Sequence, residues 1–239
     1  MEITFQKLPQ HLVIIPDGNR RWAREKELEP VEGHRAGSEA FKKIAKAVFE
    51  AGIKCFTFWT SSKINLTKRP KKESAFLVEL LKQEFKKLEE DDFIERHQIR
   101  INIFGEWRNL LPKDLEEQLD RLMAKTAKYK GAFLNFLVAY DGYEEMLQAI
   151  RKIADLKAKD KTLKITSELL KNCLYTRDLP AVDFVIRTGG EPHLSSGFLM
   201  WDIGDSQLYF TSKYWPDFSE EDLILALKDY ESRERRFGA

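Results

Sequence analysis

Apolar runs alternate with amphipathic stretches along most of this chain. Short runs rich in aliphatic, aromatic and β-branched residues predict six buried strands, at 12–15, 53–59, 99–104, 133–140, 182–186 and 207–210. Between these runs, apolar residues recur every three or four positions, as in helices that pack on a core. This order predicts an α/β fold with a mostly parallel central sheet of about six strands and helices on both faces.

Glycine, proline and capping residues indicate where the helices end. A helix is predicted over 38–52, where apolar side chains recur at helical spacing and Gly52 ends the pattern. Further helices are predicted over 70–96 and 112–129, after Asp141, and after Ser219, where Asp222 approximates a capping box. The Lys-rich stretch 151–164 is expected to be a surface loop inside one domain that spans residues 1–239.

Composition and charge exclude several classes of function. The chain has 239 residues, of which 43% are hydrophobic, so it can build one sizeable core. Its net charge of +1 provides no overall field for nucleic acid, and any anion site must be local. Cys55 and Cys173 lack metal-binding spacing, and no apolar run is long enough to cross a membrane. We therefore expect a cytoplasmic protein that binds no nucleic acid.

The first predicted strand runs directly into the sequence PDGNRRW at 16–22. Ligands of open parallel sheets bind beyond the carboxyl ends of the strands. Gly18 would let the backbone approach an anion, while Arg20 and Arg21 supply forked donors suited to phosphate. Asp17 would repel a phosphate unless Mg²⁺ lies between its carboxylate and a diphosphate. The simpler alternative is an ordinary turn followed by a solvated helix start.

A second stretch of this kind, 182–198, follows a later strand. Arg187 ends the apolar run, and Thr-Gly-Gly, His193 and Ser195 follow it. A basic residue, a flexible backbone and hydroxyl donors at a strand end suit a second anion. Two such sites on one sheet imply two phosphorylated substrates. The alternatives are a Gly-Gly hairpin with an exposed Arg187 and, for the cationic C-terminus, a helix end capped by Gly238.

Six segments carry a resemblance that covers nearly the whole chain. They are IIPDGNRRWA at 14–23, GHRAG at 33–37, NLTKRP at 65–70, DFVIRTGGE at 183–191, LYFTSKYWPDF at 208–218 and RERRFG at 233–238. In this order they resemble the cis-prenyltransferase family, whose familiar member is undecaprenyl diphosphate synthase. The resemblance implies a homodimeric Z-prenyl diphosphate synthase that uses Mg²⁺. Such an enzyme joins isopentenyl diphosphate to an allylic diphosphate such as farnesyl diphosphate and releases pyrophosphate, and its lipid product would allow peripheral membrane contact.

The resemblance also implies roles for individual residues. Asp17 is implied to hold Mg²⁺ near the departing diphosphate, and Asn65 to act in the proton-removal step. The residues implied to bind the allylic diphosphate are Gly18, Asn19, Arg21 and His34, and Arg20 and Trp22 belong to the same segment as the first of these. Ser62 and Arg69 are implied to bind substrate. Those implied for isopentenyl diphosphate are Arg187, His193 and Ser195, together with Arg236 and Gly238 reaching in from the neighbouring subunit.

Departures from the family pattern fall mainly on the isopentenyl and metal side. His193 replaces an arginine, and Gln207 stands where a glutamate helps to bind Mg²⁺. The implied second metal ligand is therefore Gln207 or the nearby Asp205, because an amide offers only a neutral oxygen. The other departures are Ile64 for a glutamate, one extra residue before Arg69, a longer SSGF segment, AYDGY at 139–143 for NYGGR, and Pro30 for an arginine.

These departures leave two alternatives open. One is a family member with an altered second substrate or a branching, lavandulyl-type coupling. The other is a non-catalytic subunit of a heteromeric prenyltransferase, although such a subunit would not need Asp17, His34 or Asn65. Product chain length depends on the floor of an apolar tunnel, which the sequence does not reveal.

Overall fold

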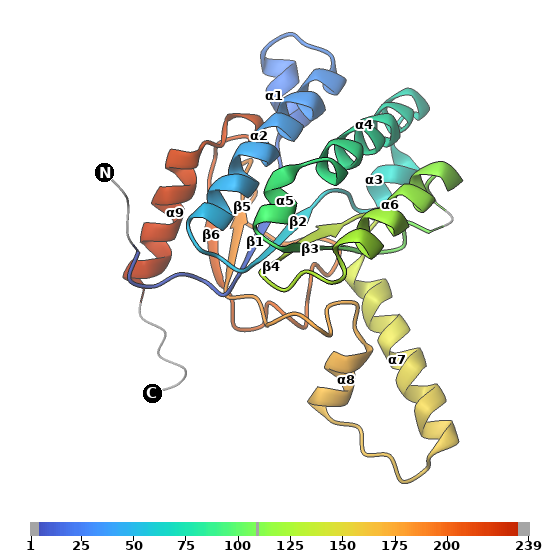
Figure 1. Cartoon of the computed structure of the whole chain (residues 1–239). Coiled ribbons are helices and arrows are strands. Elements are labelled where there is room, and N and C mark those ends of the chain that lie inside the picture. Colours follow the sequence, from blue (N-terminus) through green and yellow to red (C-terminus); the bar gives the residue numbers. More distant parts are fainter. Residues whose placement is uncertain (1–4, 109, 234–239) are drawn as a thin grey trace.

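A single parallel sheet organises the computed structural model, which describes residues 5–108 and 110–233 (Figure 1). Its strands are β1 (His11–Ile15), β2 (Cys55–Trp59), β3 (Ile99–Phe104), β4 (Ala132–Leu137), β5 (Phe184–Arg187) and β6 (Gln207–Phe210). They lie in the order β3-β4-β2-β1-β5-β6, and all five neighbouring pairs are parallel. The expected α/β fold with a sheet of six strands is confirmed.

Helices occupy most of the chain between the strands. They are α1 (Asn19–Glu25), α2 (Pro30–Glu50), α3 (Lys63–Lys68), α4 (Lys71–Glu89), α5 (Asp92–Arg96), α6 (Lys113–Thr126), α7 (Gly142–Lys159), α8 (Ser167–Cys173) and α9 (Glu220–Ser232), with a short 3-10 turn, η1, at Trp215–Asp217. The capping box of Ser219 and Asp222 is present at the start of α9. Within the described part of the chain, no helix is both long and apolar enough to cross a bilayer.

Two helices are longer than the sequence pattern indicated. Helix α2 begins at Pro30 rather than near position 38, because proline suits the first position of a helix. The stretch 151–164, expected to be a loop, is helical as far as Lys159. It is helical because Ile153 packs in a small core with Cys173 and other residues of α8.

The helix expected over 70–96 is in fact two helices. Helix α4 ends at Glu89, and α5 starts after Asp91, whose carboxylate accepts the backbone N–H of Phe93 at 2.8 Å. An aspartate at this position caps a new helix by satisfying a free backbone donor. The cap starts a new helix before β3. The apolar pattern continues through this point, so the sequence pattern alone did not reveal the break between α4 and α5.

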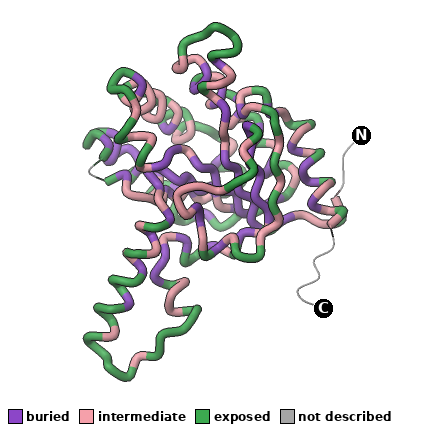
Figure 2. Tube along the Cα trace, turned by 180° about the vertical axis from the view of Figure 1, so that it is seen from behind, coloured by how far each residue is buried: buried purple, intermediate pink, exposed green. Residues whose placement is uncertain are grey.

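The two faces of the sheet are covered unequally. Helices α2, α4, α6 and α9 bury the larger core against one face, which includes Leu12, Ile14, Phe56 and Phe58. A smaller cluster covers the other face, where chain segments around Phe198 meet the alternate side chains of the strands. The Cα trace shows this buried interior beneath an exposed outer layer (Figure 2).

The smaller face also buries a line of polar side chains across three strands. His11 Nε2 lies 2.7 Å from the hydroxyl of Thr57, and His11 Nδ1 lies 2.9 Å from the carbonyl oxygen of Pro180. The side-chain amide of Asn135 donates to the same hydroxyl at 3.0 Å. Each of these buried groups therefore has a hydrogen-bond partner, as buried polar groups require.

Strands β1 and β5 lie side by side at the point where the strand order reverses. From β1 the chain continues to β2 on one side, and from β5 it continues to β6 on the other. Ligand sites of open α/β sheets form in the crevice beyond the carboxyl ends of two such strands. Here that crevice lies beyond Ile15 and Arg187, which are register partners.

Candidate active site

Asp17 lies beyond the end of β1, in the turn that leads to α1. Its backbone N–H donates to the Thr188 hydroxyl at 2.9 Å, and its carbonyl accepts from that hydroxyl at 2.8 Å and from the Trp215 N–H at 2.9 Å. Gly18 has φ 107°, and a Cβ there would approach the Tyr214 ring to 2.5 Å. Glycine is therefore needed for both conformation and space, and the turn holds Asp17 in place.

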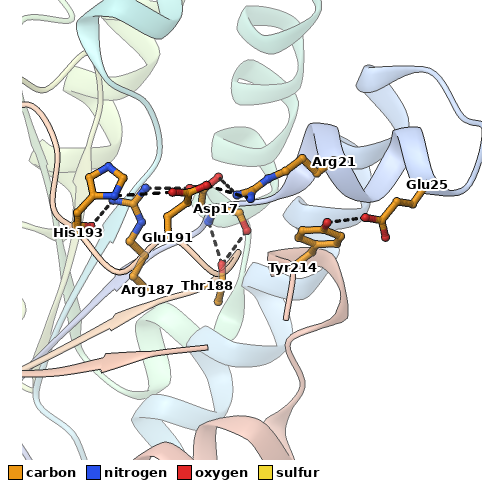
Figure 3. A network of polar contacts seen from close by, with 8 residues as sticks. All are labelled: Asp17, Arg21, Glu25, Arg187, Thr188, Glu191, His193 and Tyr214. Atoms are coloured by element: carbon orange, nitrogen blue, oxygen red, sulfur yellow. Dashed lines mark hydrogen bonds and ion pairs between the residues drawn. The ribbon is translucent and has the colours of Figure 1, made fainter. Parts of the chain in front are cut away.

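Two arginines converge on the Asp17 carboxylate (Figure 3). Arg187 Nη2 lies 2.9 Å from Oδ2, and Arg21 Nη2 lies 3.1 Å from Oδ1. Arg187 also donates to the carbonyl of His193, while Arg21 forms an ion pair with Glu191 at 3.3 Å. Segments that lie 170 residues apart in the sequence thus form one charged network.

The hairpin alternative for the segment after β5 is wrong. Strands β5 and β6 pair in parallel, so the Gly-Gly turn does not join antiparallel strands. Arg187 is also buried, with only 7% of its side chain exposed. A buried guanidinium needs charged or polar partners, and Asp17 and the carbonyl of His193 supply them.

A second charged cluster lies where α1, α2 and the start of α4 meet. Its centre is Glu73, whose Oε1 lies 3.1 Å from His34 Nε2, 3.1 Å from Arg69 Nη1 and 3.7 Å from Arg20 Nε. Burial lowers the pKa of His34, with Glu73 acting in the opposite direction. The sequence pattern does not single out Glu73, because a carboxylate four residues after an arginine at a helix start is typical of an exposed ion pair.

One cavity of about 1190 Å³ contacts both charged clusters. The predicted residues that line it are Asp17, Gly18, Asn19, Arg20, Arg21, His34, Ser62, Asn65, Arg69, Arg187 and Ser195. Its apolar wall, under α2 and α4, includes Phe41, Phe58, Leu77, Leu80, Leu81, Phe85, Leu88 and Phe136. A space with cationic groups in one part and hydrocarbon in the other suits an amphiphile with an anionic head group.

Two of the lining residues are linked at the start of α3. The Ser62 hydroxyl oxygen accepts the backbone N–H of Asn65 at 3.1 Å, which caps the helix. The cap orders the backbone that carries Asn65 at the cavity wall. Ile64 is 47% exposed and also lines the cavity, so an apolar side chain lies where the resemblance implied a glutamate.

Trp22 and His193 have other surroundings. The Trp22 indole N–H donates to Asp217 at 2.7 Å, and Lys26 lies over the indole ring. The His193 side chain is 56% exposed, and its Nδ1 lies 3.8 Å from Glu191 Oε2, while its carbonyl accepts from Arg187. Neither Trp22 nor His193 is among the described residues that line the cavity. Arg236 and Gly238 lie outside the described residues.

Gln207 and Asp205 do not join Asp17 within the chain. Gln207 begins β6 and pairs with Phe184, whereas the site-facing end of β5 is Arg187. Three residues of strand separate the two levels, which is roughly 10 Å at about 3.3 Å per residue. The buried Gln207 Oε1 has no hydrogen-bond partner among the described residues.

The donor set near Asp17 fits a Mg²⁺ ion that arrives with a diphosphate. The described residues contain no group of three or more His, Cys, Asp or Glu side chains placed to hold a metal. Mg²⁺ commonly takes only one or two carboxylates and completes its shell with water and substrate phosphates. Asp17 offers one carboxylate, and a diphosphate and water would supply the further oxygens. The buried Asn19 Oδ1, which has no partner among the described residues, lies instead against Gly37 of α2, where an added Cβ would come within 2.5 Å of it.

Comparison with known proteins gives consistent matches over almost the full length. The Prenyltransf model of the undecaprenyl diphosphate synthase family matches residues 15–238. A tritrans,polycis-undecaprenyl-diphosphate synthase (geranylgeranyl-diphosphate specific) of Methanopyrus kandleri is 39% identical over 97% of this chain and 85% of its own length. An isoprenyl transferase of Thermus thermophilus is 37% identical over 99% of this chain and 91% of its own.

A solved structure matches the fold closely. The crystal structure of lavandulyl diphosphate synthase from Lavandula x intermedia, in complex with dimethylallyl diphosphate, has a TM-score of 0.89 to this chain. It is 32% identical and covers 97% of this chain and 99% of its own. The match therefore extends over the sheet and over the helices that carry both charged clusters of this chain.

Proposed function

The chain belongs to the undecaprenyl diphosphate synthase family of prenyltransferases, and from this premise we propose that it is a Mg²⁺-dependent Z-prenyl diphosphate synthase. The proposed reaction condenses isopentenyl diphosphate with an allylic diphosphate, such as farnesyl diphosphate, and releases pyrophosphate. The observation that carries the proposal is the single cavity that contacts two charged clusters, each containing arginines, and an apolar wall. Two diphosphates and one growing hydrocarbon chain match these three features.

The allylic diphosphate is proposed to bind with its head between the two clusters. Arg20, Arg21, His34 and Arg69 provide donors there, and the tail lies along the apolar wall. When the allylic C–O bond breaks, negative charge grows on the departing pyrophosphate, and donors already fixed in place stabilise it. Mg²⁺, when bound, would neutralise part of that charge, and Asp17 would hold it together with the substrate's own phosphate oxygens.

Isopentenyl diphosphate is proposed to bind beside Arg187 and Ser195. Its terminal alkene carbon forms the new bond to the allylic carbon, and a proton then leaves the carbon next to the resulting cation. Asn65, an amide, is too weak a base to remove that proton itself. Its proposed role is to orient the groups involved, because the departing pyrophosphate is a stronger base within reach of the reaction.

Branching condensation is the second candidate. Two observations favour it: the lavandulyl diphosphate synthase match, and the absence of His193 from the described residues that line the cavity. The loss of an arginine donor would loosen the hold on the second diphosphate and allow another coupling geometry. A non-catalytic subunit is disfavoured, because the cavity retains Asp17, His34 and Asn65.

Product analysis of the purified protein alone would separate these possibilities. The protein would be incubated with Mg²⁺, labelled isopentenyl diphosphate and, in turn, dimethylallyl, geranyl, farnesyl and geranylgeranyl diphosphates. Linear Z-products support the leading proposal, branched products support the second candidate, and no product at all supports the non-catalytic role. Omitting Mg²⁺ should abolish turnover.

The assembly is proposed to be a homodimer of single-domain chains. Helices α7 and α8 project from the body as a hairpin (Figures 1 and 2). Tyr143, Leu147 and Ile150 form an exposed stripe on α7, with exposures of 61%, 46% and 52%. Such a stripe suits cover by a second copy. In the dimer, Arg236 and Gly238 are proposed to reach the neighbouring site.

The cellular setting is proposed to be the cytoplasm. Cys55 and Cys173 are both buried and unpaired, as in proteins of reducing compartments. The near-neutral net charge gives no support to nucleic-acid binding. Peripheral contact with a membrane would come through the lipid product.

A further inference from the structure

Glu73 is a buried carboxylate beside a site proposed to bind anions. The residue is only 7% exposed, and it lies behind the cavity wall. Its three partners, Arg20, His34 and Arg69, line the cavity, whereas Glu73 is absent from the described lining residues. A negative charge in this position weakens the attraction of the cluster for a diphosphate, so charge alone does not explain it.

The geometry links Glu73 to three separate elements. Arg20 lies on α1, His34 on α2, and Arg69 just before α4, and all three approach the same oxygen, Oε1. Arg69 Nη1 also lies 3.2 Å from His34 Nε2. Without Glu73, the guanidinium groups of Arg20 and Arg69 would repel one another, and the hydrogen bond that holds His34 beside them would be lost. With it, they converge beside the cavity before any substrate arrives.

Fixing cationic side chains in advance has a direct effect on binding. An arginine side chain carries about 2 kcal/mol of rotamer entropy, part of which is lost when it grips a ligand. Groups that the protein already holds in place lose less of that freedom on binding. A carboxylate behind the donors can therefore favour binding even though its charge opposes it.

A simpler role would be that of an acidic residue at a helix start. Glu73 lies in the first turn of α4, where a carboxylate stabilises the helix dipole. That role needs neither burial nor contact with α1 and α2. Glu79 on the same helix is exposed, and its carboxylate accepts from the side-chain amide of Gln83 at 2.9 Å, so it provides a matched comparison.

We propose that Glu73 is a positioning residue that holds His34 and Arg69 in the geometry that receives the diphosphate of the allylic substrate. The inference rests on the proposed function, because it assigns that substrate to this cluster. Glu73 acts through its partners and does not touch the substrate. Its effect on substrate binding depends on where the carboxylate lies as well as on its charge.

Two substitutions separate position from charge. Glu73→Asp keeps the charge but draws the carboxylate back by one methylene, and Glu73→Ala removes both. Calorimetry would measure binding of farnesyl diphosphate with Mg²⁺ and without isopentenyl diphosphate. We expect Glu73→Ala to weaken binding roughly tenfold, the equivalent of one charge-assisted hydrogen bond, and Glu73→Asp to weaken it severalfold. Glu79→Asp and Glu79→Ala should bind as the wild type does.

Steady-state kinetics and a double-mutant cycle provide further readouts. The KM for the allylic diphosphate should rise in both Glu73 variants, while the KM for isopentenyl diphosphate stays within about twofold. In an Arg69→Met background, Glu73→Ala should add little further loss, because the two residues act as a unit. Equal or tighter binding by Glu73→Asp, with an unchanged thermal midpoint, would overturn the proposal. If Glu73→Ala does not fold, binding of farnesyl diphosphate by Glu73→Asp alone tests the proposal.

These measurements keep the two proposals apart. A wild type that binds farnesyl diphosphate but forms no product would contradict the proposed function and leave the Glu73 test intact. If the wild type binds no prenyl diphosphate, inorganic pyrophosphate is the probe for the same variants. Loss of pyrophosphate binding in both Glu73 variants then supports the positioning role, and unchanged binding contradicts it.

Discussion

At the scale of single residues, Asp17 has arginine partners that a diphosphate would also attract. Its two oxygens each accept from one guanidinium, and a carboxylate oxygen retains a further lone pair for a metal ion. Asp17 can therefore hold Mg²⁺ without releasing Arg21 or Arg187. We therefore expect substitution of Asp17 to lower the catalytic rate much more than the stability of the fold.

Asp17→Asn should lower kcat by about 10²-fold or more, because the group that would hold the metal at the leaving diphosphate is lost. The asparagine keeps the shape and one acceptor for Arg187, so the thermal midpoint should change little. Steady-state kinetics across a Mg²⁺ series would measure the effect. Asp217→Asn, at an exposed carboxylate nearby, is the control. Wild-type rates with unaltered Mg²⁺ dependence in Asp17→Asn would rule out the assignment.

For Gln207 the expectation is the reverse: substitution should change the stability of the fold and leave the Mg²⁺ requirement unchanged. Because it lies at the far end of β5 and β6 from Asp17, Gln207→Glu should leave the Mg²⁺ concentration for half-maximal rate unchanged. It should lower the free energy of unfolding by about 1–3 kcal/mol, because a charge replaces a buried amide oxygen that has no partner among the described residues.

Mg²⁺ titration and urea denaturation of Gln207→Glu would test this, with Asp205→Asn as a second variant. A lower Mg²⁺ requirement in Gln207→Glu would show that this position meets a metal after all. Loss of activity in Asp205→Asn would point to that carboxylate instead.

At the scale of elements, the strands β1, β2 and β4 are joined through the buried side chains of His11, Thr57 and Asn135. Burial lowers the pKa of His11 below its ordinary value of 6.5. The unfolded chain therefore binds a proton more readily than the folded one. The stability that neutral His11 contributes is complete above about pH 6.5 and is lost as the pH falls towards the folded-state pKa.

Urea unfolding between pH 8 and pH 5 should show this loss. Its slope for a single group does not exceed about 1.4 kcal/mol per pH unit. His11→Gln should be less stable at pH 8 and should show a shallower pH dependence, because the titrating group is gone. His97→Gln, at an exposed histidine, should retain the wild-type slope. Identical slopes for His11→Gln and the wild type would show that another group is responsible.

At the scale of the whole molecule, the hairpin of α7 and α8 has only a small core of its own. Ala149, Ile153, Cys173 and Leu174 are its buried members. An exposed apolar stripe beside so small a core is an unfavourable surface for an isolated chain. Cover by a second copy would explain why the hairpin remains extended from the body.

Leu147→Asp and Ile150→Asp should convert the proposed dimer to a monomer, because each would bury a charge in an apolar contact. Analytical ultracentrifugation would measure the change, and circular dichroism would verify the fold. Leu225→Asp, at an equally exposed leucine on α9, should remain dimeric. A dimer that survives both α7 substitutions would place the interface elsewhere. If the C-terminal residues complete the neighbouring site, the monomers should also lose activity.

The sequence by itself determined the elements and the local chemistry of the turns. The strands, the stop of α2 near Gly52, the capping box at Ser219 and the turn at Gly18 all follow from side-chain period and backbone conformation, which are properties of neighbouring residues. Of the residues that the resemblance implied, eleven line the cavity, whereas its apolar wall was not among them. Failures at this level, such as the break at Asp91, arose where a local cap outweighed a continuous apolar pattern.

Only the tertiary structure decided which segments meet. The pairing of β1 with β5 sets Asp17 against Arg187, and the packing of α1 and α2 against the start of α4 surrounds Glu73 with its cations. It also separated Gln207 from Asp17. Contacts between distant segments depend on how the whole core packs, and no pattern of nearby residues encodes them. Glu73 is buried for this reason, although its sequence position alone indicates an exposed helix start.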